Sequence, residues 1–367
     1  MDIIKIDNIG SFLLPDEFKK FTGNIDEIEV YQAELTTPSQ ILTRINDGKA
    51  VLLIGEYQYA DGIYRFCQRN ENKLIMPEEI PGQDYYQGQA LKTEIKRKKL
   101  HRLLFAACND ELLFIKNQPN AEGLQKWLIE DTGGQPYLIP VRRYQKILTD
   151  MKRASEGMYF DILNDSITIY PFVYVPWDKS VPYMILEYEP FFHGKRILDV
   201  GTGTGILAIL AAKMNAKSVT ATDINPNAVS CARENVNRLG LSHIINVKDA
   251  GSLFEPVKNE IFDIVMLNAP WIQGEPKSLY DYALYDHNYK VINKFLSEVS
   301  NHLEQDGFVL LQYSDISQKK GENSIDNLYS SIERNGLKIA AKSSITRRSR
   351  ILGATENVYL FKINREQ

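Results

Sequence analysis

The sequence contains few cysteines and no long apolar run. Its 367 residues include three cysteines, Cys67, Cys108 and Cys231, which lack the spacing of a disulfide framework or a metal cluster. We therefore expect reduced thiols and no bound metal. No apolar run approaches the length needed to cross a bilayer, and the N-terminus lacks a basic segment followed by an apolar one. These absences predict a cytoplasmic protein without a membrane partner.

The chain also lacks a strong excess of one charge. Its formal net charge is -4 at pH 7, so a nucleic-acid partner is possible but not favoured. The densest positive patch is the run Lys96-Arg97-Lys98-Lys99, with His101 and Arg102 close behind. This patch is typical of a solvated helix face, or of a surface that contacts phosphate or an acidic partner.

A run of glycines at every second position follows a short apolar segment. Residues 196–205 read Arg-Ile-Leu-Asp-Val-Gly-Thr-Gly-Thr-Gly, and residues 206–214 are suited to a helix. The pattern predicts a buried parallel strand that closes on Asp199, makes a tight turn and enters the helix. The glycines are Gly201, Gly203 and Gly205. Without a Cβ they can adopt positive φ and let a nucleoside lie against the backbone.

A second acid follows the next predicted strand. Residues 218–222 are β-rich and end on Asp223, 24 positions after Asp199, where a βαβ unit would deliver a carboxylate to ribose hydroxyls. The spacing differs from the dinucleotide fingerprint, so it implies no pyrophosphate. A Rossmann-like domain that binds another nucleotide is the alternative.

These two segments resemble the first two motifs of class I S-adenosylmethionine-dependent methyltransferases. The resemblance implies S-adenosyl-L-methionine as the cofactor and covers most of residues 195–313. It also implies the cofactor-binding residues, which are Asp199, Gly201, Gly203, Gly205, Asp223, Ile224, Asp249 and Asn268.

The predicted fourth strand, residues 262–267, opens onto Asn268-Ala269-Pro270-Trp271. This tetrapeptide resembles the Asn-Pro-Pro-Tyr sequence of methyltransferases that modify planar nitrogen, and it supplies the catalytic residues. An amide nitrogen is a poor nucleophile, so a site must hold its hydrogens with acceptors and aim its lone pair at the methyl group. Asn268 and a backbone carbonyl would be the acceptors, and Trp271 would stack on the planar group.

Ala269 departs from the family pattern. Alanine keeps the carbonyl but loses the fixed φ of proline, so we expect a less rigid turn, which leaves the substrate class open. The alternative for the tetrapeptide is an ordinary strand-to-loop exit with a buried tryptophan.

The chain divides into three predicted regions. Residues 1–155 form an α+β accessory domain for substrate recognition, and residues 156–190 form a hairpin and linker, with strands over 167–170 and 172–175. Residues 191–367 form the α/β catalytic domain, a Rossmann-like, mostly parallel sheet with helices on both faces. The linker is similar to that of release-factor glutamine methyltransferases. Ribosomal-RNA guanine methyltransferases have a similar size and order, but the decayed first copy of their fold is not detectable here.

Two further groups of side chains are candidates for substrate contact. Tyr282, Tyr285 and His287 follow the tetrapeptide in a loop, although a lone histidine in a loop is more often structural. Arg347, Arg348 and Arg350 could hold a carboxylate or phosphate, or could simply lie in an exposed loop.

The predicted function is methyl transfer to a planar amide or amine nitrogen of a macromolecule, either a protein glutamine or an RNA base. A small-molecule methyltransferase of secondary metabolism is the alternative. A noncatalytic S-adenosylmethionine-binding module is a third possibility, and Asn268 with Trp271 argues against it.

Overall fold

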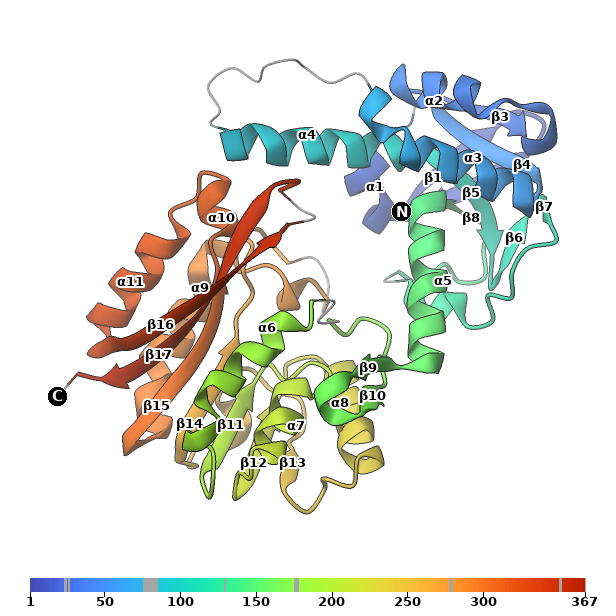
Figure 1. The fold of residues 1–367 in the computed structure, drawn as a ribbon. Coiled ribbons are helices and arrows are strands. Elements are labelled where there is room, and N and C mark those ends of the chain that lie inside the picture. Colours follow the sequence, from blue (N-terminus) through green and yellow to red (C-terminus); the bar gives the residue numbers. More distant parts are fainter. Residues whose placement is uncertain are drawn as a thin grey trace. The chain divides into compact units, whose positions relative to one another are not determined.

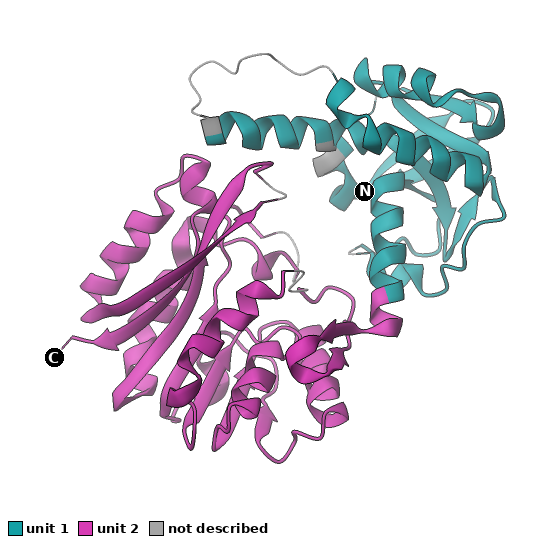
Figure 2. Ribbon diagram, viewed as in Figure 1, with its two compact units in different colours: residues 1–152 teal, residues 153–367 magenta. Residues whose placement is uncertain are grey.

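The chain forms two units, Met1–Lys152 and Arg153–Gln367, in a computed structural model (Figure 2). The structure describes residues 1–22, 25, 27–74, 85–128, 130–174, 178–276, 280–349 and 352–366. Each unit has its own sheet, so the two are described separately.

The first unit is α+β, as predicted. Its sheet has the order β1-β2-β8-β5-β4-β3, in which β3, β4 and β5 run parallel. The strands are β1 (Asp2–Ile6), β2 (Gly10–Leu14), β3 (Ile28–Gln32), β4 (Ala50–Glu56), β5 (Leu103–Cys108), β6 (Glu111–Leu113), β7 (Ile115–Lys116) and β8 (Tyr137–Pro140). The helices are α1 (Asp16–Thr22), α2 (Pro38–Asn46), α3 (Tyr57–Arg69), α4 (Tyr85–Leu100) and α5 (Val141–Glu156).

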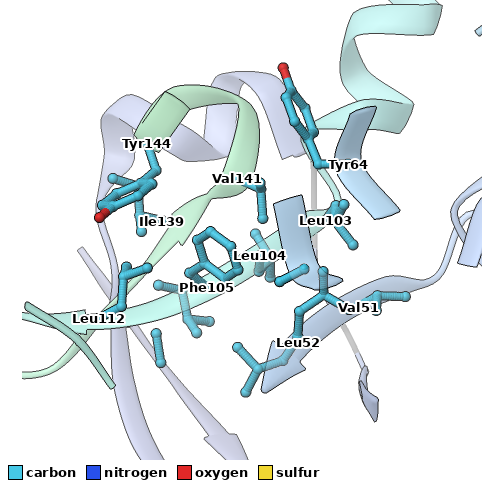
Figure 3. Close-up of a cluster of buried hydrophobic side chains, with 14 of the residues drawn as sticks. Val51, Leu52, Tyr64, Leu103, Leu104, Phe105, Leu112, Ile139, Val141 and Tyr144 are labelled. Atoms are coloured by element: carbon cyan, nitrogen blue, oxygen red, sulfur yellow. The ribbon is translucent and has the colours of Figure 1, made fainter. Parts of the chain in front are cut away.

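The core of this unit lies between the sheet and its helices. The apolar stretches of β4 and β5 are almost fully buried, as expected of parallel strands covered on both faces. Phe105 of β5 packs edge to face against Tyr144 of α5, with 5.7 Å between ring centroids (Figure 3).

The positive patch lies on and just after α4. Lys96, Lys98 and Lys99 bond to Asn72, Glu94 and Asn46 of the same unit. His101 is buried, and the side chain of Arg97 lies outside the described residues. The three lysines therefore all have partners within the first unit.

The second unit has the predicted Rossmann-like sheet, in the order β13-β12-β11-β14-β15-β17-β16 (Figure 1). The strands are β11 (Arg196–Val200), β12 (Ser218–Thr222), β13 (Ile245–Val247), β14 (Phe262–Asn268), β15 (Leu303–Ser314), β16 (Leu337–Arg348) and β17 (Thr355–Arg365). In this sheet β13, β12, β11, β14 and β15 run parallel to one another. β17 is antiparallel to its two neighbours, β15 and β16. The helices are α6 (Ser180–Tyr183), α7 (Ile206–Lys213), α8 (Pro226–Arg238), α9 (Lys290–Glu298), α10 (Ile316–Lys319) and α11 (Ser324–Arg334). An antiparallel final strand is what the family resemblance implies.

The predicted hairpin over 167–175 is wrong. The hairpin lies earlier, between β9 (Met158–Phe160) and β10 (Asp165–Ile167). Beyond it, the Asn235 side chain bonds both the N–H and the carbonyl of Thr168, at 2.7 and 3.0 Å. Pro171 has no N–H to donate, and Phe172 has φ 58°, so this segment does not pair as a strand. Residues 175–177, including Trp177, lie outside the described residues.

Of the two alternatives for Arg347 and Arg348, the exposed loop is wrong. Both lie at the end of β16, which pairs with β17 over its whole length. Arg350 lies outside the described residues. The end of β16, with Arg347 and Arg348, therefore belongs to the regular sheet of the second unit.

Candidate functional site

The glycine turn after β11 is held by a buried carboxylate. Asp199 is fully buried, and one of its oxygens accepts hydrogen bonds from Thr202 Oγ1 at 2.6 Å and from the backbone N–H of Ala208 at 3.1 Å. The glycines have φ values of 69°, 56° and 86° at Gly201, Gly203 and Gly205. Asp199 therefore ties the turn to the first turn of α7.

Burial changes the titration of this acid. Loss of water around the carboxylate raises the pKa of Asp199 to about 7, and the two hydrogen bonds oppose that rise. The second oxygen, Oδ1, is buried and accepts no hydrogen bond among the described side chains and backbone.

The second predicted acid lies beside the same turn. Asp223 follows β12 and accepts hydrogen bonds from the N–H groups of Gly203 at 2.9 Å and Asn225 at 2.8 Å. Burial raises the pKa of Asp223, whereas these backbone bonds lower it. The carboxylate is thus fixed next to the glycine turn, and its remaining lone pairs can accept from hydroxyl groups.

A first pocket opens over this turn. Five of the predicted cofactor-binding residues line it: Gly201, Gly203, Asp223, Ile224 and Asn268. A Cβ on Gly203 would lie 4.0 Å from the Tyr174 carbonyl at a backbone φ of 56°, so the cradle suits glycine. Ile224 is apolar yet 41% exposed, and offers an apolar surface to a planar base. An acid, a glycine cradle and an apolar wall fit the nucleoside part of S-adenosylmethionine.

Three predicted cofactor-binding residues do not line the first pocket. Asp199 lies beneath the turn, and Gly205 faces α8, where a Cβ would lie 3.3 Å from Ala232 Cβ. The side chain of Asp249 is 96% exposed and pairs with Arg233 at 2.7 Å. The structure therefore gives Asp199 and Gly205 positions that support the turn, and turns Asp249 towards solvent.

Other residues line the first pocket without having been predicted. They are Tyr174, Pro182, Val200, Thr202, Thr204, Ile206, Leu207, Thr222, Asn225, Ala228, Ser252, Leu253, Leu267, Ala283, Lys290, Val291 and Lys294. Ser252 and Leu253, a few positions after Asp249, line the first pocket in its place. Since Leu253 has φ 47°, the chain turns back there, which the sequence pattern did not signal.

A second pocket of about 410 Å³ adjoins the first. It is lined by Tyr174, Asp178, Lys179, Asn268, Ala269, Trp271, Ile272, Ala283, Leu284, Ile316, Arg347, Arg348, Ser349 and Glu356. Tyr174, Asn268 and Ala283 line both pockets. The residues predicted to be catalytic therefore surround the junction, with Pro270 on the first pocket and Ala269 and Trp271 on the second.

Hydrogen bonds hold the tetrapeptide despite its alanine. The Ala269 N–H donates to the Gln312 carbonyl at 3.2 Å, a bond that proline could not make. Ser317 Oγ donates to the Trp271 carbonyl at 3.0 Å and accepts from the Gln273 N–H at 2.9 Å. These bonds hold the backbone at Ala269, Trp271 and Gln273. The side-chain oxygen of Asn268 is buried and has no hydrogen-bond partner among the described residues.

Trp271 is not an open stacking surface. Its side chain is nearly buried, and the Arg347 guanidinium carbon lies 5.2 Å from the ring centroid. In the loop beyond it, Tyr282 lines the first pocket, whereas Tyr285 and His287 line neither. Lys277 to Leu279 lie outside the described residues.

The described residues contain neither a membrane-spanning helix nor a cluster of metal ligands. No described helix is both long and apolar enough to cross a membrane. No group of three or more histidine, cysteine, aspartate or glutamate side chains in the described ranges is arranged to hold a metal ion.

Known methyltransferases match parts of this chain. Residues 186–270 match the family of ribosomal protein L11 methyltransferases (PrmA). A Methanocaldococcus jannaschii protein named "putative protein N5-glutamine methyltransferase" is 29% identical over 171 residues, which cover 44% of this chain and 83% of that protein. The L11 methyltransferase of Listeria monocytogenes is 41% identical over 161 residues, 35% of this chain and 50% of the relative. The crystal structure of a Lactobacillus delbrueckii L11 methylase is 22% identical, with a TM-score of 0.41, and covers 57% of this chain and 91% of that one.

The chain is a class I S-adenosylmethionine-dependent methyltransferase, as the sequence motifs predicted. Its methyl donor is S-adenosyl-L-methionine. The chain spans only half the length of the Listeria relative, so these matches do not define the methyl acceptor.

We predict that Asp223→Asn weakens S-adenosylmethionine binding, because the variant loses the charged acceptor beside the glycine turn. Loss of a hydrogen bond to a charged group costs about 1.5 to 3 kcal/mol, or roughly a 10- to 100-fold rise in Kd. Calorimetry on the folded variant measures this directly. Asp249→Asn is the matched control and should bind normally, and unchanged affinity in the Asp223 variant would contradict the assignment.

We also predict that the cofactor-free protein loses stability as the pH rises from about 4 to about 7, in part through Asp199. In this window the folded state keeps a proton that the unfolded chain releases, so each rise in pH favours unfolding. One unit of pKa shift corresponds to about 1.4 kcal/mol, so the contribution is on the order of a few kcal/mol. Urea unfolding of Asp199→Asn should show a flatter pH dependence, with Asp249→Asn as the control. An unchanged slope would assign the titration to another group.

Proposed function

We propose that this chain transfers a methyl group to a planar amide nitrogen of a macromolecule, most consistently a protein glutamine. An exocyclic amine of an RNA base is the second acceptor of the same chemical kind. Bound S-adenosylmethionine supplies a methyl group that is already activated by its sulfonium, so the residues around the acceptor must mainly align a weak nucleophile.

One observation carries this proposal: Asn268 lines both pockets, and its buried side-chain oxygen has no partner among the residues that the structure describes. A buried acceptor without a donor is costly, so its persistence favours a ligand that supplies one. An amide N–H is such a donor. Asn268 would accept that hydrogen and thereby leave the lone pair of the nitrogen directed at the first pocket.

The charges of the second pocket favour a protein acceptor over RNA or a small apolar metabolite. Its wall carries both acids, Asp178 and Glu356, and cations, Lys179, Arg347 and Arg348. A mixed wall suits the amide and polar neighbours of a peptide, whereas the phosphates of RNA call for an excess of cations. The names of the Methanocaldococcus and Listeria relatives support a protein substrate.

We propose that the first unit selects the methyl acceptor. The glycine turn, Asp223 and Asn268 all belong to the second unit, so the cofactor site needs no residue of the first. An additional folded unit on such a chain binds the macromolecule that is methylated.

We predict that Asn268→Ala lowers turnover about 100-fold or more while S-adenosylmethionine affinity stays near normal, because the variant loses an oriented catalytic hydrogen bond. The assay follows labelled methyl groups into the protein and RNA fractions of a cell lysate. Acid hydrolysis of a methylated amide releases methylamine, which separates glutamine products from methylated lysine.

Asn237→Ala, an exposed residue of α8, is the control and should retain activity. Full turnover of the Asn268 variant would refute the alignment mechanism. Label in the RNA fraction alone would replace glutamine with a base as the acceptor.

A fragment of residues 153–367 should bind S-adenosylmethionine but fail to methylate the native acceptor, because it keeps both pockets and lacks the first unit. Circular dichroism must first establish that the fragment folds, since the cut passes through α5 and can expose apolar surface. A folded fragment with full activity would show that the first unit serves another purpose.

A further inference from the structure

Arg347 is a fixed part of the second pocket, although the mechanism above does not use it. Its Nε donates to Glu356 Oε1 at 2.9 Å, and its Nη1 lies 3.4 Å from Asp178 Oδ2. The Glu356 side chain is only 2% exposed, and its other oxygen accepts from Ser314 Oγ at 3.1 Å. Arg347 and Glu356 lie directly opposite each other in the pairing of β16 with β17.

Moving the guanidinium out of this position would cost free energy. Its departure would strand the buried carboxylate of Glu356 without its cation, which is strongly unfavourable. It would also give up the contact with the Trp271 ring. Arg347 therefore covers one face of the Trp271 ring, and a planar acceptor group that approaches this face meets the guanidinium.

Arg347 still has donors to offer. A guanidinium carries five N–H groups in a planar fork. Arg347 contacts Glu356 through Nε and Asp178 through Nη1, and its other N–H groups are not used by these two contacts. Its side chain is 23% exposed, so the remaining donors can reach a ligand. Such a fork matches a carboxylate, which can accept two parallel hydrogen bonds.

Two more cations line the same pocket. Lys179 pairs with Asp161 at 3.7 Å, an acid whose side chain is 76% exposed. Arg348 is exposed, and no ion pair of its side chain occurs within the described ranges. Both pocket carboxylates, in contrast, already bond to Arg347 and to serine side chains. The groups of the second pocket that can still bind a ligand are therefore its cations, which favour an anion.

We propose that Arg347 is a specificity residue that pairs with a carboxylate adjacent to the methylated amide, so that the preferred acceptor is a glutamine flanked by an acidic residue. This inference rests on the proposed function and narrows its substrate class. A protein carboxylate is favoured over RNA phosphate because Asp178 and Glu356 stand on the same wall, where a run of phosphates would be repelled.

The test measures binding without methyl transfer. The full chain, saturated with S-adenosylhomocysteine, is titrated with two blocked peptides, Ac-Ala-Asp-Gln-Asp-Ala-NH2 and Ac-Ala-Asn-Gln-Asn-Ala-NH2. The acidic peptide should bind roughly tenfold more tightly, as expected for a charge-assisted hydrogen bond. In Arg347→Gln this preference should fall below about twofold, while the affinity for S-adenosylhomocysteine is unchanged.

Two further variants keep the result interpretable. The double variant Arg347→Gln with Glu356→Gln removes the charge left buried by the single change, and should also lose the preference. Lys338→Gln removes an exposed cation at the other end of β16 and should keep it.

Equal affinity for the two peptides, no measurable binding of either, or a preference that survives in both Arg347 variants would overturn the inference. Weaker binding of a short single-stranded RNA to Arg347→Gln, without a change for the peptides, would also overturn it. Methylamine release from labelled protein tests the proposed function separately. Its presence together with no acid preference rejects only the role of Arg347.

Discussion

The buried carboxylate of Asp199 is the constraint on which the site depends. It bonds Thr202 and the first turn of α7, and so fixes the turn in which Gly201, Gly203 and Gly205 take positive φ. That turn in turn positions Asp223, because the Gly203 N–H donates to its carboxylate. An acid that never reaches the first pocket thus determines the geometry of the acid that lines it. Its raised pKa is a cost of this arrangement, since a carboxylate without water favours its neutral form.

The register of the central strands places the junction of the two pockets. Asn268 ends β14 opposite Gln312 of β15, and the Gln312 carbonyl accepts the Ala269 N–H. The side-chain amide of Gln312 also donates to the Val181 carbonyl, so the strand, the tetrapeptide and the segment at α6 meet at one residue. Hydrogen bonds therefore fix the acceptor side as well as the cofactor side. A shift of one residue between β14 and β15 would separate Asn268 from both pockets.

The sequence predicted the features whose cause is local. Glycines after an apolar strand, an acid after the next strand and the Asn-Ala-Pro-Trp sequence each require particular residues at fixed spacing. It failed where the cause lies elsewhere in the chain. Asp249 pairs with Arg233 of α8, and the segment after the β9–β10 hairpin is held by Asn235, which binds Thr168 from 67 positions away. The exposed alternation of β16 gave little sign of a strand, because an edge strand buries few side chains.

The final hairpin explains how these distant residues reach the acceptor side. In a parallel sheet, functional side chains gather at the carboxyl ends of the strands, and Asn268 follows that rule. β17 runs antiparallel, so its first residues, including Glu356, lie at that same edge. β16 reverses once more, which brings its last residues there and sets Arg347 opposite Glu356. The antiparallel direction of β17 therefore brings Glu356 to this edge, because the first residues of a parallel strand would lie at the opposite end, and the return of β16 sets Arg347 beside it.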